Sequence, residues 1–115
     1  MRVLVIEDDA AISELLENVL SEAGYTVDTA NTAGKALPII GDTYSLVITD
    51  WRLPDGDGRL IADMAAALGC KTLIISGMPE EPGHTHPTLT KPFRLSEVVA
   101  AVVRIIGKPD LENAA

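Results

Sequence analysis

Short apolar runs alternate along this chain with segments whose apolar residues have helical spacing. The first of these runs, at residues 2–6, is rich in β-branched residues and shows no polar alternation, which is typical of a parallel strand covered on both faces. We predict five strands, at residues 2–6, 25–30, 46–49, 72–75 and 88–90. We predict four helices: one capped by Asp9 and ended by Gly24, one from about Thr32 with Pro38 near its last turn, one from Arg59 to Leu68, and one from Leu95 to Ile106.

This alternation predicts an α/β fold with a doubly wound, five-stranded parallel sheet, because parallel neighbours are joined by right-handed crossovers. The link between Ser76 and Thr88 departs from the pattern. It reads GMPEEPGHTHP and contains three prolines. Proline lacks a backbone N–H and interrupts a helix, so we expect the fourth helix to be missing or shortened to one turn near Pro79 to Glu81.

Length and composition limit the domain organisation. With 115 residues, of which 47% are hydrophobic, the chain can form one domain with one core. We expect a single domain over residues 1–115, with its core at about 1–107, a frayed tail at 108–115 and no attached output domain. The apolar runs are too short to span a membrane, and the N-terminus turns acidic early, so we expect a cytoplasmic protein without a membrane partner.

The charge argues against a nucleic-acid partner. The net charge is −8, and the nine basic residues are scattered singly. Affinity for nucleic acid depends largely on Lys and Arg neutralising phosphates, so we expect no direct binding to nucleic acid. The one cysteine, Cys70, cannot form an internal disulfide, and we expect it to be a small buried hydrophobe.

Residues with complementary chemistry follow the strands. Behind the first, third, fourth and fifth strands stand, in that order, Glu7-Asp8-Asp9, Asp50, Ser76-Gly77 and Lys91-Pro92. In an open α/β sheet ligands bind at the carboxyl ends of the strands. Clustered carboxylates repel one another unless a cation neutralises them, and Mg²⁺ prefers oxygen ligands. Together with a hydroxyl and an ammonium group, this set fits phosphoryl transfer.

Four motifs in this order, VLVIEDD, LVITDWRLPDGDG, LIISG and TKPF, resemble the receiver domain of two-component response regulators, the CheY-like fold. The resemblance covers roughly residues 1 to 107 and implies a flavodoxin-like sheet of strand order 2-1-3-4-5. It implies that Asp50 accepts a phosphoryl group from a histidine kinase or a histidine phosphotransfer protein. The signal would then pass to a downstream protein, and the chain would be no enzyme beyond its own phosphorylation and dephosphorylation.

The resemblance also implies a Mg²⁺ cofactor. Its ligands would be Asp8 directly, Glu7 through water, Asp50, and the backbone carbonyl of Arg52. The residue that the resemblance identifies as the phosphoacceptor is thus also a metal ligand.

Three further positions carry roles by resemblance. Ser76 matches the switch hydroxyl, Lys91 matches the phosphate-contacting lysine, and the Lys91–Pro92 peptide would be cis. An aromatic switch residue usually stands three positions before the lysine, where this chain has Thr88. With the short crossover, this departure indicates an atypical single-domain receiver.

Other interpretations stay open. The chain could be a receiver-fold scaffold that phosphorylation does not regulate, or a Mg²⁺-dependent small-molecule phosphatase, although 115 residues leave little room for a substrate pocket. We interpret Asp55 and Asp57 as turn residues, because the closing Glu of a calcium loop is missing. We interpret His84 and His86 as solvated loop residues rather than metal ligands, since no third ligand is in view.

The last predicted helix has a wide apolar face. It is formed by Leu95, Val98, Val99, Val102, Val103, Ile105 and Ile106. These side chains cover an arc of roughly 160°, wider than the stripe of about 100° that one core-facing side needs. The helix is therefore either deeply buried or part of a partner surface, and we hypothesise a homodimer through Val98, Val102 and Ile105.

Overall fold

A computed structural model of the chain describes residues 1–77 and 86–109. Within these residues, five parallel strands form one sheet in the order β2-β1-β3-β6-β7. The strands are β1 (Arg2–Ile6), β2 (Thr26–Ala30), β3 (Leu46–Asp50), β6 (Lys71–Ser76) and β7 (Thr88–Thr90). Because β6 and β7 are the fourth and fifth predicted strands, the predicted fold class and strand order are confirmed.

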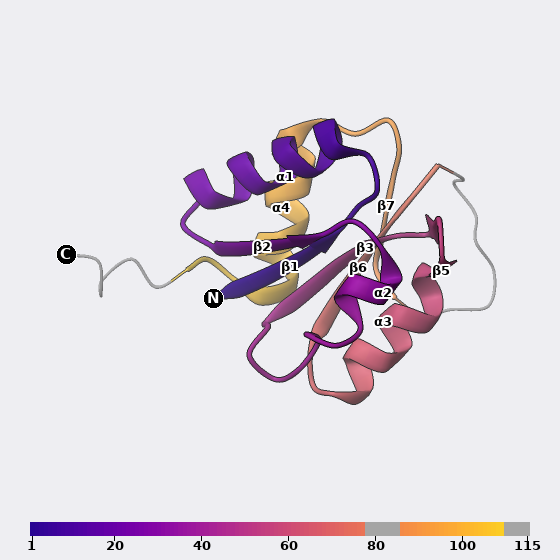
Figure 1. Cartoon of the computed structure of the whole chain (residues 1–115). Coiled ribbons are helices and arrows are strands. Elements are labelled where there is room, and N and C mark those ends of the chain that lie inside the picture. Colours follow the sequence, from indigo (N-terminus) through magenta and orange to yellow (C-terminus); the bar gives the residue numbers. More distant parts are fainter. Residues whose placement is uncertain (78–85, 110–115) are drawn as a thin grey trace.

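Helices cover both faces of the sheet (Figure 1). On one face lie α1 (Ala10–Glu22) and α4 (Leu95–Ile106), and on the other lie α2 (Ala33–Ala36) and α3 (Gly58–Ala67). Successive residues of β1 pack into opposite layers: Val3 and Val5 contact the α1 and α4 side, whereas Leu4 and Ile6 contact the α2 and α3 side. This two-sided burial explains why the sequence of β1 shows no polar alternation.

The ends of α1 follow from its flanking residues. The side chain of Asp9 accepts hydrogen bonds from the backbone amides of Ala11 (2.9 Å) and Ile12 (3.2 Å), as expected of an N-cap. Past the other end, Gly24 has a φ of 103°, a conformation that side chains disfavour. The predicted start and end of this helix are confirmed.

The helix after β2 is shorter than expected. Helix α2 has four residues, begins after Thr32, whose hydroxyl accepts a hydrogen bond from the amide of Lys35 (3.1 Å), and ends at Ala36. The prediction of a helix that contains Pro38 is wrong, because proline has no N–H with which to extend the hydrogen-bond ladder. The predicted single turn near Pro79 to Glu81 lies outside the described residues.

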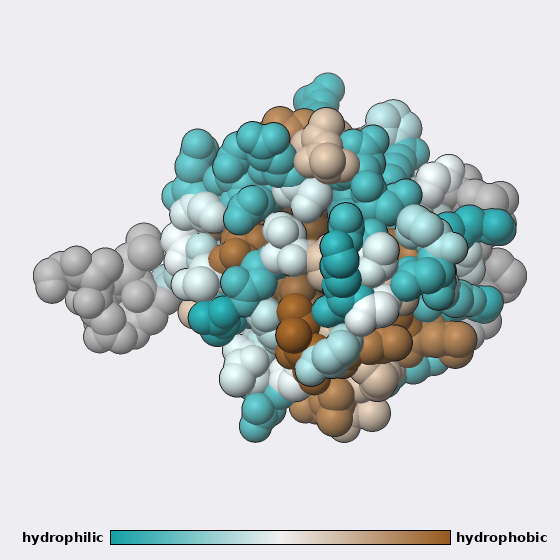
Figure 2. Space-filling view, in the orientation of Figure 1, coloured by the Kyte–Doolittle hydropathy of each residue, from teal (hydrophilic) through white to brown (hydrophobic). Residues whose placement is uncertain are grey.

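The apolar face of α4 belongs to the core. Val98 and Val102 are fully buried, and Ile105 is partly buried against the same cluster. The hypothesis that the two valines present a dimer surface is therefore wrong: the face is wide because α4 packs against both α1 and the sheet. Apolar surface gathers instead over α3 (Figure 2), where 68% of Leu60 is exposed.

Two further expectations concern burial and the membrane. Cys70 is buried, and its thiol donates to the carbonyl oxygen of Gly41 (3.2 Å), which agrees with a small hydrophobe in the core. Among the helices of residues 1–77 and 86–109, none has the length and hydrophobicity that a membrane span requires.

Candidate functional site

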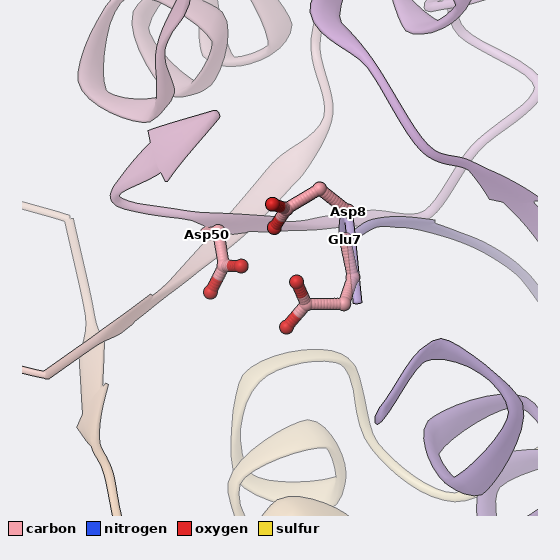
Figure 3. A group of neighbouring side chains, drawn as sticks. All are labelled: Glu7, Asp8 and Asp50. Carbon is pink, nitrogen blue, oxygen red and sulfur yellow. The ribbon is translucent and has the colours of Figure 1, made fainter. Parts of the chain in front are cut away.

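Three carboxylates meet at the carboxyl ends of the neighbouring strands β1 and β3. Glu7 and Asp8 follow β1, and Asp50 is the last residue of β3. One carboxylate oxygen of each lies within 4.8 Å of the others, and Figure 3 shows the three side chains pointing toward a common space. Glu7 and Asp50 are only 2% and 7% exposed, whereas Asp8 is exposed. The structure thus brings together the acidic residues selected from the sequence.

The cluster disfavours its own negative charge. Burial raises the pKa of the Glu7 carboxyl, and a hydrogen bond and the negative charge of Asp50 raise it further. The backbone amide of Asp9 donates to Glu7 Oε2 (3.1 Å) and acts in the opposite direction. A divalent cation would relieve this repulsion, and a donor set of oxygen atoms alone fits Mg²⁺ better than a softer metal.

A lysine supplies positive charge from the other side of the site. The Nζ atom of Lys91 lies 3.1 Å from Asp50 Oδ1 and 3.4 Å from Glu7 Oε1. Burial alone lowers the pKa of Lys91, but the hydrogen bond and charge of Asp50, together with those of Glu7, outweigh it, so the pKa is raised. Lys91 therefore carries its proton at neutral pH. The Lys91–Pro92 peptide is cis, the isomer that the family resemblance implies.

Asp8, Asp50 and Lys91 line a pocket of about 300 Å³. Its lining residues are Asp8, Asp50, Trp51, Arg52, Ile75, Ser76, Gly77 and Lys91. Ser76 is buried at the end of β6, next to β3 in the sheet. The pocket thus combines carboxylates, a hydroxyl and an ammonium group, a set of groups that suits a phosphoryl ligand.

Thr88, the expected non-aromatic switch position, does not line this pocket. It is the first residue of β7, its side chain is exposed, and its hydroxyl donates to the carbonyl oxygen of His86 (3.3 Å). Thr88 therefore begins β7, whereas Lys91 directly follows its other end.

Trp51 forms a wall of the pocket beside Asp50. Its backbone amide donates to the carbonyl oxygen of Ile75 (2.8 Å), and its half-buried indole lies under the guanidinium of Arg59, 4.6 Å from the ring centroid. A cation held over the indole face limits the movement of the ring. Trp51 is therefore a well-placed spectroscopic reporter for events at Asp50.

Gly58 is a site residue that the sequence did not reveal. Its amide donates to the carbonyl oxygen of Trp51 (2.8 Å), and a Cβ atom at this position would lie 1.9 Å from the carbonyl oxygen of Asp50. Because no side chain fits such an approach, the first turn of α3 packs directly against the backbone of Asp50. The sequence offered one indication, the glycine at the end of LPDGDG, but a turn by itself is enough to explain a glycine at that position.

Asp55 makes a contact that its turn context does not predict. A short hairpin, β4 (Arg52–Leu53) and β5 (Gly56–Asp57), follows Asp50. From the hairpin tip, the Asp55 carboxylate accepts hydrogen bonds from the amides of Ala33 (2.7 Å) and Gly34 (2.9 Å), and these bonds lower its pKa. The chain segment that follows Asp50 is therefore tied to α2.

His86 is not a solvated loop residue. Its side chain is 9% exposed, with Nδ1 2.7 Å from Thr72 Oγ1 and Nε2 2.6 Å from Asp63 Oδ1. The sequence interpretation is wrong here because β6 and α3 approach the start of β7, which no local pattern shows. The second histidine of the pair, His84, lies outside the described residues.

Comparisons with known proteins agree with this geometry. The family described as response regulator receiver domain matches residues 3–103. The transcriptional regulatory protein TcrA of Mycobacterium tuberculosis is 34% identical over 113 residues, which cover 87% of this chain and 44% of TcrA. KdpE of Staphylococcus aureus is 33% identical over 116 residues, which cover 93% of this chain and 50% of KdpE. The chain therefore spans at most half of the length of these two relatives.

Solved structures show the same fold. The non-phosphorylated receiver domain of HemR from Leptospira biflexa superposes with a TM-score of 0.82 and 28% identity, covering 94% of this chain and 95% of that one. The response regulator TrrA from Thermotoga maritima, solved in complex with Mg²⁺ and BeF, has a TM-score of 0.79 and 28% identity, covering 90% and 96%.

Proposed function

Because this chain belongs to the response regulator receiver family, we propose that it is a Mg²⁺-dependent phosphoacceptor whose modified residue is Asp50. The observation that carries the proposal is the contact between the Lys91 ammonium and the Asp50 carboxylate, at 3.1 Å, beside Glu7 and Asp8. A carboxylate nucleophile, a neighbouring cation and a metal-binding acidic pair are the parts that phosphoryl transfer to a carboxylate requires.

The residues present fit a magnesium ion. The carboxylates of Glu7, Asp8 and Asp50 and the backbone carbonyl of Arg52 would hold it, with Glu7 acting through water. When bound, Mg²⁺ neutralises the carboxylates and the charge that develops on the transferred phosphoryl group. The raised pKa of Glu7 favours this role, since ionised Glu7 is costly in the absence of a cation.

In the proposed reaction, an oxygen of the Asp50 carboxylate attacks the phosphorus of a phosphohistidine on the donor protein. The new O–P bond forms as the P–N bond breaks, and the imidazole nitrogen leaves with the electron pair. Lys91, which keeps its proton, transfers its hydrogen bond from Asp50 to a phosphoryl oxygen. The Ser76 hydroxyl, which lies in the same pocket, donates to another oxygen.

The donor would be a histidine kinase or a histidine phosphotransfer protein, and the phosphorylated form would act on a downstream protein. We further propose that the chain works in the cytoplasm, with no direct contact to nucleic acid. The alternatives are a scaffold that phosphorylation does not regulate and a Mg²⁺-dependent phosphatase. The Lys91–Asp50 contact favours the phosphoacceptor over the scaffold, because a scaffold has no need of a cation held on Asp50.

Trp51 allows a direct test, since it is the only tryptophan and lines the pocket. We expect Mg²⁺, and then Mg²⁺ with beryllofluoride as a phosphoryl mimic, to change its fluorescence in the wild type but not in Asp50→Ala. Asp42→Ala, which removes an exposed carboxylate outside the pocket, should respond like the wild type. A wild type that does not respond to millimolar Mg²⁺ would favour the scaffold, and turnover of many equivalents of a phosphate ester would favour the phosphatase.

A further inference from the structure

We infer that His86 is a positioning residue for the phosphoryl site, because it anchors the start of β7 and thereby holds Lys91 against Asp50. The inference rests on the proposed function of Asp50, since it concerns the lysine that serves that residue. It concerns a side chain that neither lines the pocket nor belongs to the four motifs.

The imidazole of His86 joins three elements. Its Nδ1 faces the Thr72 hydroxyl of β6 at 2.7 Å, and its Nε2 faces the Asp63 carboxylate of α3 at 2.6 Å, while the residue itself leads into β7. In a neutral ring, Nε2–H donates to Asp63 and Nδ1 accepts from Thr72; in a protonated ring, both nitrogens donate. Either form keeps the ring in place between the two partners.

Strand β7 needs such an anchor because its own packing is weak. It has three residues, lies at the edge of the sheet and, among the residues that the structure describes, pairs with β6 alone. Thr88 is exposed, and Leu89, its one apolar residue, is only partly buried. Segments with few buried apolar contacts open at low free-energy cost, so ties at the ends of a short edge strand have a large share in keeping it paired.

Backbone hydrogen bonds at the two ends of β7 connect His86 with the site. Directly after His86, the carbonyl oxygen of Pro87 accepts from the amide of Ile74 (2.9 Å). At the other end, the amide of Lys91 donates to the carbonyl oxygen of Ser76 (2.7 Å). Fraying at the start of such a short strand reaches Lys91 within three residues, and Lys91 Nζ then loses its position 3.1 Å from Asp50.

The same geometry predicts that the position of Lys91 depends on His86, whereas the positions of the carboxylates do not. The carboxylates follow or end the inner strands β1 and β3, whereas the ring of His86 contacts β6 and α3. Loss of the ring should therefore weaken the interaction with a phosphoryl group and leave Mg²⁺ binding nearly unchanged. A general loss of structure would weaken both, so the ratio of the two affinities separates positioning from stability.

The test compares His86→Ala with the wild type in three measurements. These are the Mg²⁺ affinity from Trp51 fluorescence, the beryllofluoride affinity at saturating Mg²⁺, and hydrogen exchange of the Lys91 amide in metal-free protein. We expect the beryllofluoride affinity to fall about tenfold and the Lys91 amide to exchange about tenfold faster, the scale of one lost hydrogen bond to a charged partner. The Mg²⁺ affinity should not fall, because no metal ligand is touched, and should rise by less than about twofold, because a displaced Lys91 competes less for the carboxylates.

Further variants complete the design. His86→Asn and His86→Gln each place an amide near one of the two ring nitrogens and should restore part of the beryllofluoride affinity. Lys71→Ala, an exposed position next to Thr72 on β6, is the matched control and should behave like the wild type. If His86→Ala fails to fold, Asp63→Ala can replace it, because the Asp63 side chain is 65% exposed and its loss removes one hydrogen-bond partner of His86. This variant should show the same pattern, with a fall in beryllofluoride affinity of about threefold.

Two results would overturn the inference: unchanged beryllofluoride affinity and Lys91 exchange in His86→Ala or Asp63→Ala, or an equal loss of Mg²⁺ and beryllofluoride affinity. A wild type that does not respond to beryllofluoride would refute the proposed function, and this inference with it. The wild-type measurement thus distinguishes the failure of one from the failure of the other.

Discussion

The acidic half and the cationic half of the site are built on different parts of the sheet. Glu7 and Asp50 stand at the ends of β1 and β3, which have five residues each and are paired on both sides. Every residue of β3 is buried. Lys91 follows β7, a three-residue edge strand without a buried residue.

This difference shows how one sheet can hold a rigid group and an adjustable group within 3.1 Å of each other. Glu7 and Asp50 are held together in the buried centre of the sheet, and burial, together with the hydrogen bond and the negative charge of Asp50, raises the pKa of Glu7. The lysine is held by local ties at the sheet edge. We therefore expect substitutions at the centre of the sheet to affect stability and metal binding. Substitutions at the edge of the sheet should mainly affect the affinity for a phosphoryl group or its mimic.

The largest effect should come from breaking the centre with Gly58→Ala. The new Cβ would lie 1.9 Å from the carbonyl oxygen of Asp50, where backbone cannot move aside. We expect the free energy of unfolding in urea to fall by about 3 kcal/mol, the upper range for overpacking. Gly41→Ala is the control, because a Cβ there meets nothing within 4 Å. Equal stability of the two variants would show that α3 does not approach Asp50 so closely.

At the edge, Lys91→Met should separate the two ligands. The loss of the ammonium group should weaken beryllofluoride binding by on the order of tenfold to a hundredfold, since charge-assisted hydrogen bonds are lost. Mg²⁺ affinity should rise roughly threefold, because Lys91 no longer competes as the cation next to Glu7 and Asp50. Trp51 fluorescence measures both, with Lys71→Met as the control. A fall in Mg²⁺ affinity would contradict this division of roles.

A smaller effect is expected where the hairpin after Asp50 is tied to α2. Asp55→Asn weakens the carboxylate's two hydrogen bonds to the amides of Ala33 and Gly34. The hairpin begins at Arg52, whose carbonyl is a proposed metal ligand, so Mg²⁺ affinity should fall about threefold. Isothermal titration with Mg²⁺ can measure this, with Asp42→Asn as the control. An unchanged Mg²⁺ affinity would show that the hairpin needs no tie to α2.

The smallest effect should come from the opposite edge, β2, which carries no proposed site residue. Asp28 accepts a hydrogen bond from the Tyr44 hydroxyl (2.8 Å) and pairs with Arg2, and these contacts lower its pKa. A lowered pKa means that this stabilisation is present above the ordinary carboxyl pKa and is lost as the pH falls through the lowered value. Asp28→Asn should therefore cost about 0.5 kcal/mol at pH 7, because the pair is partly exposed.

Urea unfolding of Asp28→Asn and the wild type at several pH values measures this difference. It should disappear once the pH has fallen through the lowered pKa of Asp28, while Mg²⁺ affinity stays unchanged at neutral pH. A difference that does not depend on pH would mean that the Asp28 charge is not its source.

Elements whose signal is local were predicted well. The bounds of β1, β7 and α4 agree with the expected ones, because strand and helix periodicity can be read within one segment. The acidic cluster could also be anticipated, since the carboxyl ends of parallel strands meet at one edge of the sheet. The length of α2 was overestimated, because the sequence pattern does not show whether a helix ends before a proline or continues past it. In the structure α2 ends at Ala36, before Pro38.

Contacts between distant segments were not predictable in this way. Asp55 meets residues 33 and 34, and His86 meets Thr72 and Asp63, through packing that no spacing rule describes. The sequence of the turn does not distinguish Gly58 from an ordinary turn glycine. The structure does, because a Cβ atom at Gly58 would lie 1.9 Å from the carbonyl oxygen of Asp50. The burial of Val98 and Val102 likewise depended on where α1 lies.

The amino-acid order by itself thus determined the alternation of strands and helices, the doubly wound sheet, and the acidic, hydroxyl and cationic groups at its carboxyl edge, because each of these follows from periodicity and from the parallel arrangement of strands. Only the tertiary structure decided how these groups are held: the glycine behind Asp50, the carboxylate that ties the hairpin to α2, and the histidine at the start of β7. Such supports join residues that are far apart in the chain, and their partners are selected by three-dimensional packing rather than by any local pattern.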